Sequence, residues 1–329
     1  MSSLSATTSS TFDSTKYIDI GANLLDTKFL GEYNGSTKHP SDIDTVLSRS
    51  LAGYPKSDGS LNYNAVCERI IITSGTFEEC KASIEFCKEI NAKTGLQSTS
   101  TTAGFHPTRS AEYIDSIDLL NFIKDNIEYL TAFGELGLDY DRLQFADKEA
   151  QHLSLNKQLN VIKQLKEEFG IRKPLFIHNR NCGDDLYDIL KTFKESNSGD
   201  LSGVVHSFDD SIELATKYLN LGLYIGLNGC SFRTEDNLSV IKEIPLERIL
   251  LETDSPWCDL RQTHAGFKYV QTKFESVKEK KWKEGCYVKN RMEPSLIGQV
   301  AECLAGVKGE EVEVVRRVCG ENTMNLFFS

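Results

Sequence analysis

The stretch Thr131 to Arg142, TAFGELGLDYDR, decides the fold because it joins an apolar strand to an unusual polar ending. Glu135 stands between two glycines, and the run closes on further charged residues. Glycine lets other groups approach the backbone closely, and a carboxylate held there on a rigid strand can serve a metal ion or a proton. The alternative is a strand that ends in a solvated turn. The residues at the ends of the other predicted strands distinguish the two interpretations.

Short apolar runs of this kind alternate along the chain with longer amphipathic segments. In residues 77–90, FEECKASIEFCKEI, apolar side chains recur at spacings of three and four, which is typical of a helix buried on one face. Eight strand-then-helix units predict an α/β fold of the (β/α)8 TIM-barrel type. An open, doubly wound sheet is the alternative, but no GxGxxG opens a first helix. The predicted strands span residues 17–24, 69–75, 98–107, 131–140, 174–180, 203–208, 223–229 and 249–256.

The chain divides into a short tail and one large domain. Residues 1–15 are rich in Ser and Thr and cannot bury enough apolar surface to offset their ordering entropy, which predicts a disordered tail. Residues 16–329 are expected to form a single barrel domain. Within it, the Gly-, Ser-, Asp- and Asn-rich segment 54–64 is interpreted as a loop insertion before the second strand.

Composition limits what the carboxylates can belong to. With 329 residues, 40% hydrophobic and 26% charged, the chain is typical of a globular protein with a sizeable core. No apolar run approaches the roughly 18 to 20 residues of a membrane span, and no secretory or mitochondrial signal is recognisable. Nine cysteines without a CxxC pair favour reduced thiols. We expect a monomer, without membrane contact, in the cytoplasm, the nucleus or both.

The ends of the predicted strands carry unusual residues. Catalytic groups of TIM barrels lie at the carboxyl ends of strands, where the loops converge on one mouth. One histidine alone is more often structural than functional, but three of the six histidines lie at these ends together with several carboxylates. A single site explains the whole set, which comprises His106, Glu135, His178, His206, Glu252 and Asp254.

Imidazoles combined with carboxylates suit a catalytic divalent cation that keeps positions open for water and substrate. A cation of this kind predicts hydrolysis as the reaction class. Asp254 is also expected to take a proton from the attacking water, and Glu252 is expected to point the same way because residues i and i+2 of a strand share a face. The predicted metal ligands are Glu135, His178, His206 and Asp254.

The strand endings GFHP, GELGLDYDR, FIHNR, VVHSF and LLETDSPW, in this order and spacing, resemble the TatD family of metal-dependent nucleases in its eukaryotic branch. The resemblance extends from about residue 17 to the C-terminus. It implies a deoxyribonuclease, a 3′-to-5′ exonuclease favouring single-stranded DNA, with Mg²⁺ as the usual divalent metal cation and Mn²⁺ or Zn²⁺ as alternatives. By position it also implies the four metal ligands named above, with active-site roles for His106 and Glu252.

One departure from the family pattern concerns the first strand. Many relatives carry an HxH pair there, whereas this chain has Gly21 and Asn23. Glycine has no side chain to offer a metal, and a neutral amide is a poor substitute for imidazole. A tightly held second ion is therefore not expected, and Asn23 is assigned to substrate binding.

A nuclease must also hold a polyanion, although this chain has a formal net charge of −11. Residues 261–291 contain nine Lys or Arg against three Glu, interleaved with aromatic residues, which favours a local surface for single-stranded DNA. The alternative is a solvated loop that packs its aromatic rings on the barrel. Within this segment, His264 and Arg291 are the residues predicted to reach the mouth of the site and bind substrate.

Two other functions remain open at this point. A metal-dependent esterase or amidase, such as a D-aminoacyl-tRNA deacylase, could use the same residues, because barrel and site fix the reaction type better than the substrate. An inactive barrel that serves as a binding scaffold is the third possibility. The intact set of ligands disfavours it, since a scaffold has no need for buried charge.

Overall fold

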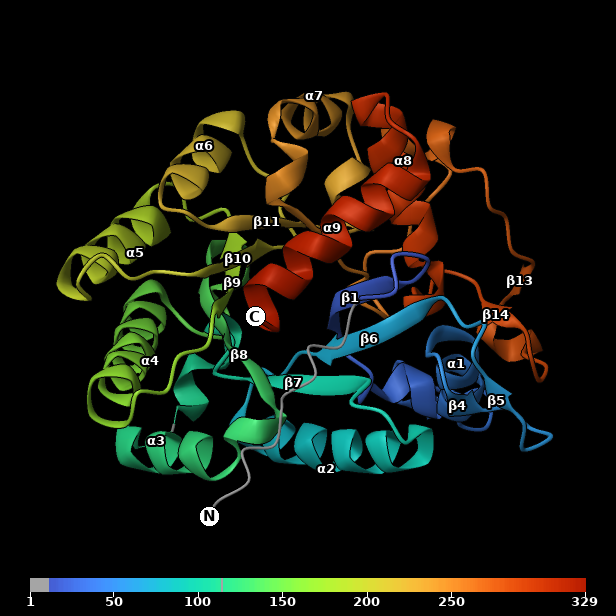
Figure 1. Cartoon of the computed structure of the whole chain (residues 1–329), viewed down its shortest axis with the longest axis horizontal. Coiled ribbons are helices and arrows are strands. Elements are labelled where there is room, and N and C mark those ends of the chain that lie inside the picture. Colours follow the sequence, from blue (N-terminus) through green and yellow to red (C-terminus); the bar gives the residue numbers. More distant parts are fainter. Residues whose placement is uncertain (1–11, 114) are drawn as a thin grey trace, which may run out of the picture.

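The computed structural model describes residues 12–113 and 115–329, which form a barrel of eight parallel strands (Figure 1). A parallel bridge between Ala22 and Ser255 joins the last strand region to the first. The predicted (β/α)8 barrel is confirmed, although the last strand ends at Leu251 and not at residue 256. In their order round the barrel the strands are β1 (Tyr17–Ala22), β6 (Cys67–Ile72), β7 (Thr99–Ala103), β8 (Leu130–Asp139), β9 (Leu175–Arg180), β10 (Gly203–His206), β11 (Tyr224–Leu227) and β12 (Ile249–Leu251).

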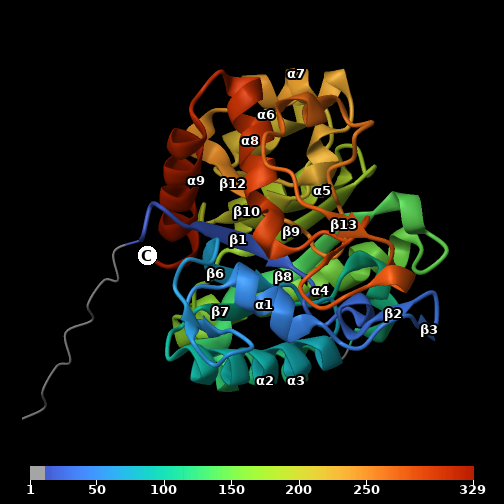
Figure 2. The same ribbon diagram turned by 90° about the vertical axis from the view of Figure 1, so that its right-hand side faces the viewer.

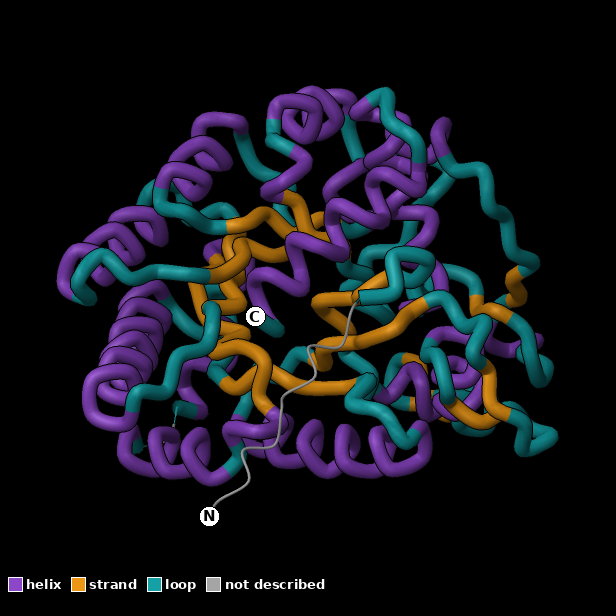
Figure 3. Tube along the Cα trace, in the orientation of Figure 1, coloured by secondary structure: helices purple, strands orange, loops and turns teal. Residues whose placement is uncertain are grey.

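Helices surround the strands as an outer layer (Figure 3). Their ends follow local chemistry: the predicted helix in 77–90 begins where the Thr76 side chain accepts the Glu79 N–H, and it stops at Gly95 with φ 67°. Among the described residues, no helix combines the length and hydrophobicity needed to cross a membrane. The described helices are α1 (Ile43–Ser50), α2 (Phe77–Thr94), α3 (Ser116–Asp125), α4 (Lys148–Phe169), α5 (Asp185–Ser196), α6 (Ile212–Asn220), α7 (Glu235–Glu243), α8 (Ile297–Lys308) and α9 (Val312–Phe327).

The interior of the barrel is a packed apolar core that is closed at its amino end. Leu326 and Phe327 of α9 pack on this core, and Figure 1 shows α9 lying across the strands. Substrate access is therefore left to the carboxyl end, where the predicted site residues lie. The buried strand residues inside the barrel are Ile20, Ile71, Ala132, Phe176, Val204 and Leu250.

Two expectations about loops and the tail need adjustment. The insertion at 54–64 contains a short antiparallel pair, β4 (Tyr54–Pro55) and β5 (Leu61–Asn62). The predicted tail of residues 1–15 lies outside the described residues as far as residue 11. For residues 12–15 the prediction of disorder is wrong. The Asp13 N–H donates to Glu68 at 2.8 Å, and the Phe12 ring occupies the space beside Gly320. The missing side chain at Gly320 makes that close packing possible.

The segment 261–291 follows β12 and contains only short elements, among them β13 (Ser276–Val277) and β14 (Tyr287–Val288). It lies on the same side of the barrel as α1 and the small hairpin of β2 (Glu32–Tyr33) and β3 (Ser36–Thr37) (Figure 2). Trp282 stacks on His39 with ring centroids 5.1 Å apart. At least part of the aromatic content of the segment 261–291 therefore serves packing.

Candidate active site at the carboxyl end of the barrel

Strand β8 carries Glu135 and is buried along its whole length. Its register with β9 shifts between Phe133 and Leu136. The shift contains Gly134 with φ 147°, and Gly137 with φ 151° follows it. A Cβ at Gly137 would lie 1.9 Å from the His178 carbonyl oxygen, so only glycine permits β9 to come this close. The polar residues at the end of β8 are therefore buried against β9 and do not form a solvated turn.

Three imidazole rings surround one oxygen of Glu135. Oε1 lies 2.7 Å from His178 Nδ1, 2.8 Å from His206 Nε2 and 3.3 Å from His106 Nε2. His178 and His206 are register partners on neighbouring strands, and His106 follows β7. His106, Glu135 and His178 offer ligand atoms that all lie within 4.8 Å of one another, a spacing suited to one metal ion. We name Glu135 and these three histidines the carboxylate–imidazole cluster.

The charge state of this cluster follows from its burial and its contacts. Burial alone raises the pKa of Glu135, but the charges of His206 and His106 hold that pKa well below its ordinary value. Burial lowers the pKa of His206, yet the carboxylates of Glu135 and Glu252 raise it well above its ordinary value. Without a metal, the anionic carboxylate is thus balanced by protons on imidazole, and a divalent cation would take their place.

Two further carboxylates hold the histidine rings from outside the cluster. Asp139 Oδ2 lies 3.3 Å from His178 Nε2, and Glu252 Oε2 lies 3.5 Å from His206 Nδ1. Both carboxylates are buried. Carboxylates in such positions orient imidazole ligands. The role of Asp139 was not among the predictions, although its place at the end of the TAFGELGLDYDR stretch gave a signal.

Asp254 and Asn23 meet on another side of the site. The Asn23 side-chain amide donates to Asp254 Oδ1 at 3.0 Å and accepts a hydrogen bond from Thr73 at 2.8 Å. Burial and the nearby carboxylates of Glu252 and Glu135 raise the pKa of Asp254 to about 6, against the opposing charge of His206. Asp254 has φ 51° and lies beyond β12, so a left-handed turn aims it, and not the strand alternation that the sequence suggested.

The glycine that departs from the family pattern has a steric reason. A Cβ at Gly21 would lie 2.7 Å from Glu252 Oε2 and 3.1 Å from the Phe176 ring. The Glu252 carboxylate therefore occupies the space that a side chain at this position would need. Glu252 Oε2 instead faces His206 Nδ1 at 3.5 Å, an ion-pair distance, and neither atom makes a hydrogen bond.

The rim of the site carries two residues that sequence reasoning missed. Trp257 follows Asp254 by three residues and is 47% exposed. The Lys28 ammonium lies 3.3 Å from the centroid of the Trp257 ring. In the part of the chain that the structure describes, Lys28 forms no ion pair with a carboxylate. The motif DSPW contained the signal for Trp257, whereas nothing in the sequence placed Lys28 beside it.

The two residues expected from the basic segment differ in position. His264 is half-buried, and burial together with the charge of Arg233 lowers its pKa. Arg291 is only 2% exposed and pairs with Asp42 at 2.6 Å and Glu293 at 2.9 Å. The expectation that Arg291 reaches the mouth and binds substrate is therefore wrong, because its guanidinium is already engaged by two buried carboxylates.

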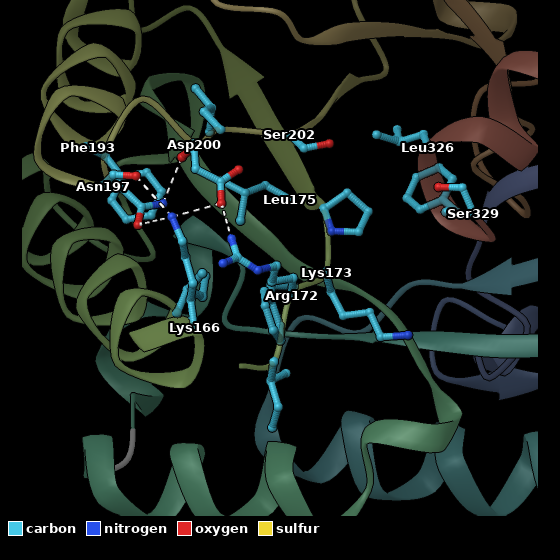
Figure 4. Close-up of a pocket in the computed structure, with 16 residues that line it drawn as sticks. Lys166, Arg172, Lys173, Leu175, Phe193, Asn197, Asp200, Ser202, Leu326 and Ser329 are labelled. Carbon is cyan, nitrogen blue, oxygen red and sulfur yellow. Dashed lines mark hydrogen bonds and ion pairs between the residues drawn. The ribbon is translucent and has the colours of Figure 1, made fainter. Parts of the chain in front are cut away.

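A pocket at the opposite end of the barrel has different chemistry. It holds a cavity of about 280 Å³ beside the amino end of β9, and none of the predicted site residues line it (Figure 4). Lys166 and Arg172 point toward Asp200 there, at 2.8 and 2.7 Å. Both cations are thus engaged by one carboxylate, and no histidine is among the described residues that line the pocket, so the carboxyl end remains the candidate active site.

Comparison with known proteins agrees with the fold. Residues 60–328 match the family model described as TatD related DNase. The deoxyribonuclease Tat-D of Schizosaccharomyces pombe is 35% identical, over 95% of this chain and 96% of that protein. A TatD family hydrolase from Entamoeba histolytica superimposes with a TM-score of 0.84 at 35% identity, covering 95% of this chain and 98% of its own. An uncharacterised amidohydrolase from Saccharomyces cerevisiae superimposes with a TM-score of 0.83 at 30% identity, covering 95% and 100%. On these grounds the chain belongs to the TatD-related DNase family of metal-dependent hydrolases.

Proposed function

We propose that this protein is a divalent-metal-dependent deoxyribonuclease that removes nucleotides from single-stranded DNA in the 3′-to-5′ direction. The observation that carries the proposal is the carboxylate–imidazole cluster, in which one carboxylate oxygen lies 2.7 to 3.3 Å from three ring nitrogens. A relative that is 35% identical over 95% of this chain is named a deoxyribonuclease. An inactive scaffold would gain nothing from charges buried at this density.

The proposed cation ligands are Glu135, His178, His206 and Asp254, with His106 as a further donor. When bound there, a divalent cation lowers the pKa of a water molecule and offsets charge on a phosphoryl oxygen. Carboxylate donors suit Mg²⁺, which we propose as the activator, while the imidazole donors also accept Mn²⁺ or Zn²⁺.

The remaining steps belong to the protein's own side chains. Asp254 takes the proton that the attacking water loses, and the Asn23 amide keeps the carboxylate oriented by donating to Oδ1. Glu252 and Asp139 fix the rings of His206 and His178 by contacting their outer nitrogens. His106 Nε2 lies 3.3 Å from Glu135 Oε1 and completes the set of donors around the cation, while its Nδ1 is held by Thr108 at 2.7 Å.

A preference for single strands follows from the rim. An exposed indole ring such as Trp257 can stack on an unpaired base, whereas the bases of a duplex already stack on one another. The Lys28 ammonium beside it can contact the adjoining phosphate. The half-buried His264 adds a contact from the neighbouring loop. Asn23 supports substrate binding by holding the Asp254 carboxylate in place.

The experiment compares two positions of one fluorescent label on the same single-stranded oligonucleotide. The purified protein is dialysed against chelator and assayed with Mg²⁺, Mn²⁺ or Zn²⁺, with duplex DNA and RNA as competing substrates. A 3′ label should leave at once as a mononucleotide, while a 5′ label should give a descending ladder. Cleavage that starts at the 5′ end, or duplex cut as fast as single strands, contradicts the proposed specificity.

The same preparation tests the rival activity. D-aminoacyl-tRNA serves as the ester substrate under the metal conditions that give most turnover. Release of the amino acid without release of nucleotides would show that the protein is a deacylase and not a nuclease. An absence of turnover on every substrate with every metal would favour the scaffold.

A further inference from the structure

Two cysteines lie in contact at the edge of the site. The Sγ atoms of Cys230 and Cys258 are 2.8 Å apart. Cys230 belongs to the 3-10 turn Gly229–Phe232 after β11, and Cys258 follows β12, so the two thiols come from neighbouring loops at the carboxyl end. A Cβ at Gly229 would lie 2.0 Å from the Cys258 carbonyl oxygen, which shows how tightly these loops pack.

The surroundings of the two sulfurs are unlike. An Arg233 guanidinium nitrogen lies 3.2 Å from Cys230 Sγ, whereas Asp254 Oδ2 lies 3.3 Å from Cys258 Sγ. A positive neighbour favours nucleophilic behaviour of a thiol, and Cys258 is partly exposed at the mouth. One sulfur is thus within reach of a small oxidant, and the other is placed to attack it.

We propose that Cys230 and Cys258 form a modification site that hydrogen peroxide converts into a disulfide. The sulfurs must close by about 0.8 Å, from 2.8 Å to the S–S bond length of about 2.0 Å. The Cys258 sulfur attacks one peroxide oxygen and the O–O bond breaks. Water is the leaving group, and Cys258 becomes a sulfenic acid. Cys230 sulfur then attacks the sulfenic sulfur, the S–S bond forms, and the S–O bond breaks. Both thiol protons end in water, so two thiols and one peroxide give one disulfide and two waters.

The disulfide has a consequence for the neighbouring carboxylate. Cys258 loses the proton that it shares with Asp254 Oδ2, and its sulfur turns toward Cys230. The loop from Asp254 to Cys258, in which both ends have φ 51°, becomes tied to the 3-10 turn. Oxidation should therefore lower hydrolysis, and a thiol reductant should restore it. This consequence rests on the proposed function of Asp254, whereas the disulfide itself does not.

The experiment exposes the full-length protein to graded hydrogen peroxide, blocks free thiols by alkylation and maps the peptides by mass spectrometry. We expect a peptide pair joined through Cys230 and Cys258 at the lowest effective dose. Cys286→Ser is the matched control, since Cys286 is also partly exposed but contacts no other cysteine among the described residues. Cys230→Ser should abolish the joined pair, and Cys258→Ser repeats the test if that variant folds poorly.

Hydrolysis is measured on the same samples. Reversible inhibition in the wild type and in Cys286→Ser, but not in Cys230→Ser, supports the whole proposal. A joined pair without any fall in hydrolysis overturns the effect on Asp254. If Cys230 and Cys258 are both still alkylated at peroxide doses that oxidise Cys286, the proposed modification site is wrong. Untreated protein that never hydrolyses DNA refutes the proposed function, and the peptide map still decides the disulfide.

Discussion

Two clusters of buried charge lie near the carboxyl end of the barrel, and they are built in opposite ways. In one, Arg291 pairs with Asp42 and Glu293, and Arg49 adds a second contact to Glu293 at 2.5 Å. Two guanidinium groups thus face two carboxylates. In the carboxylate–imidazole cluster, Glu135 meets three histidines, and three more carboxylates, Asp139, Glu252 and Asp254, stand around them.

The difference lies in charge balance. The arginine cluster is complete without any further ion, because arginine is always protonated. Around the carboxylate–imidazole cluster, Arg142 contacts Asp139 at 3.6 Å, but four carboxylates still leave an excess of negative charge when the histidine rings are neutral. Buried charge therefore indicates function only where the protein's own residues leave it unbalanced.

The largest effect is expected from Glu135→Ala. This change removes the oxygen that all three histidines contact, so metal binding and hydrolysis should fall to background while the fold persists. Turnover, metal content and thermal unfolding with and without Mg²⁺ measure the three properties. Wild-type protein should gain about 2.7 kcal/mol of stability when metal is present at 100 times its Kd, and the variant should gain nothing.

A matched change in the arginine cluster serves as its control. Glu293→Ala should leave the metal-induced gain in stability intact although the protein unfolds more easily. If Glu135→Ala instead keeps its metal and its turnover, the carboxylate–imidazole cluster is structural and the distinction between the two clusters fails.

Asp254→Asn is expected to lower kcat by about 10²- to 10⁴-fold, because the amide cannot accept the proton of the attacking water. DNA affinity should change little, since phosphate contacts come from other residues. Single-turnover rates at saturating DNA, together with binding to a non-hydrolysable oligonucleotide, separate the two quantities. A fall in affinity with an unchanged single-turnover rate would make Asp254 a binding residue.

Much of this cluster could be predicted from sequence, for a physical reason. Parallel strands of a barrel bring their carboxyl ends to one mouth, so Glu135, His178 and His206 converge whatever the details of packing. The fold followed from the same periodicity. Contacts made by loops could not be predicted, because loop geometry depends on residues far away in the chain. Lys28 above Trp257 and Cys230 beside Cys258 are of this kind.

Arg291 shows most clearly which contacts could not be predicted from the sequence. Its place in a basic, aromatic-rich segment suggested phosphate binding, but its actual partner Asp42 lies 249 residues earlier in the chain. Composition cannot distinguish a cation that faces solvent from one that long-range packing has buried. The glycines of β8 gave a better signal, because a close backbone approach is a local demand.

Arg291→Ala should destabilise the protein by about 3 to 5 kcal/mol, because Asp42 and Glu293 would be left buried without their partner. Chemical denaturation measures the free energy of unfolding. Protein that remains folded should keep its kcat and its salt dependence of DNA binding. A stable variant with weakened DNA binding would restore Arg291 as a phosphate contact.

Trp257→Ala should weaken binding of single-stranded DNA by about 5- to 150-fold, since stacking on one aromatic ring contributes about 1 to 3 kcal/mol per base. The folded state should be unaffected because the ring is 47% exposed. Trp257→Phe keeps an aromatic face and should recover most of the affinity. Equally weak binding in both variants would assign the effect to interactions of the indole other than stacking.

The smallest effect concerns exposed lysines that share a segment with buried Arg291. Lys280, Lys281 and Lys283 face solvent, so any interaction they make with DNA is electrostatic and screened by salt. Replacing all three by Gln should make the slope of log K against log salt less negative by about 2, because each phosphate that a lysine neutralises on a single strand contributes roughly 0.7 to that slope. Turnover of a dinucleotide should not change, because so short a substrate does not reach them.

The matched control for these lysines removes the same charge elsewhere, through Lys81→Gln, Lys88→Gln and Lys157→Gln on the outer helices α2 and α4. If both triple variants show the same change in slope, only net charge matters and the segment has no special role. If neither changes, these lysines are a solvated face. A slope change confined to the first variant would show that one segment contains both kinds of cation, Arg291 for stability and the lysines for substrate.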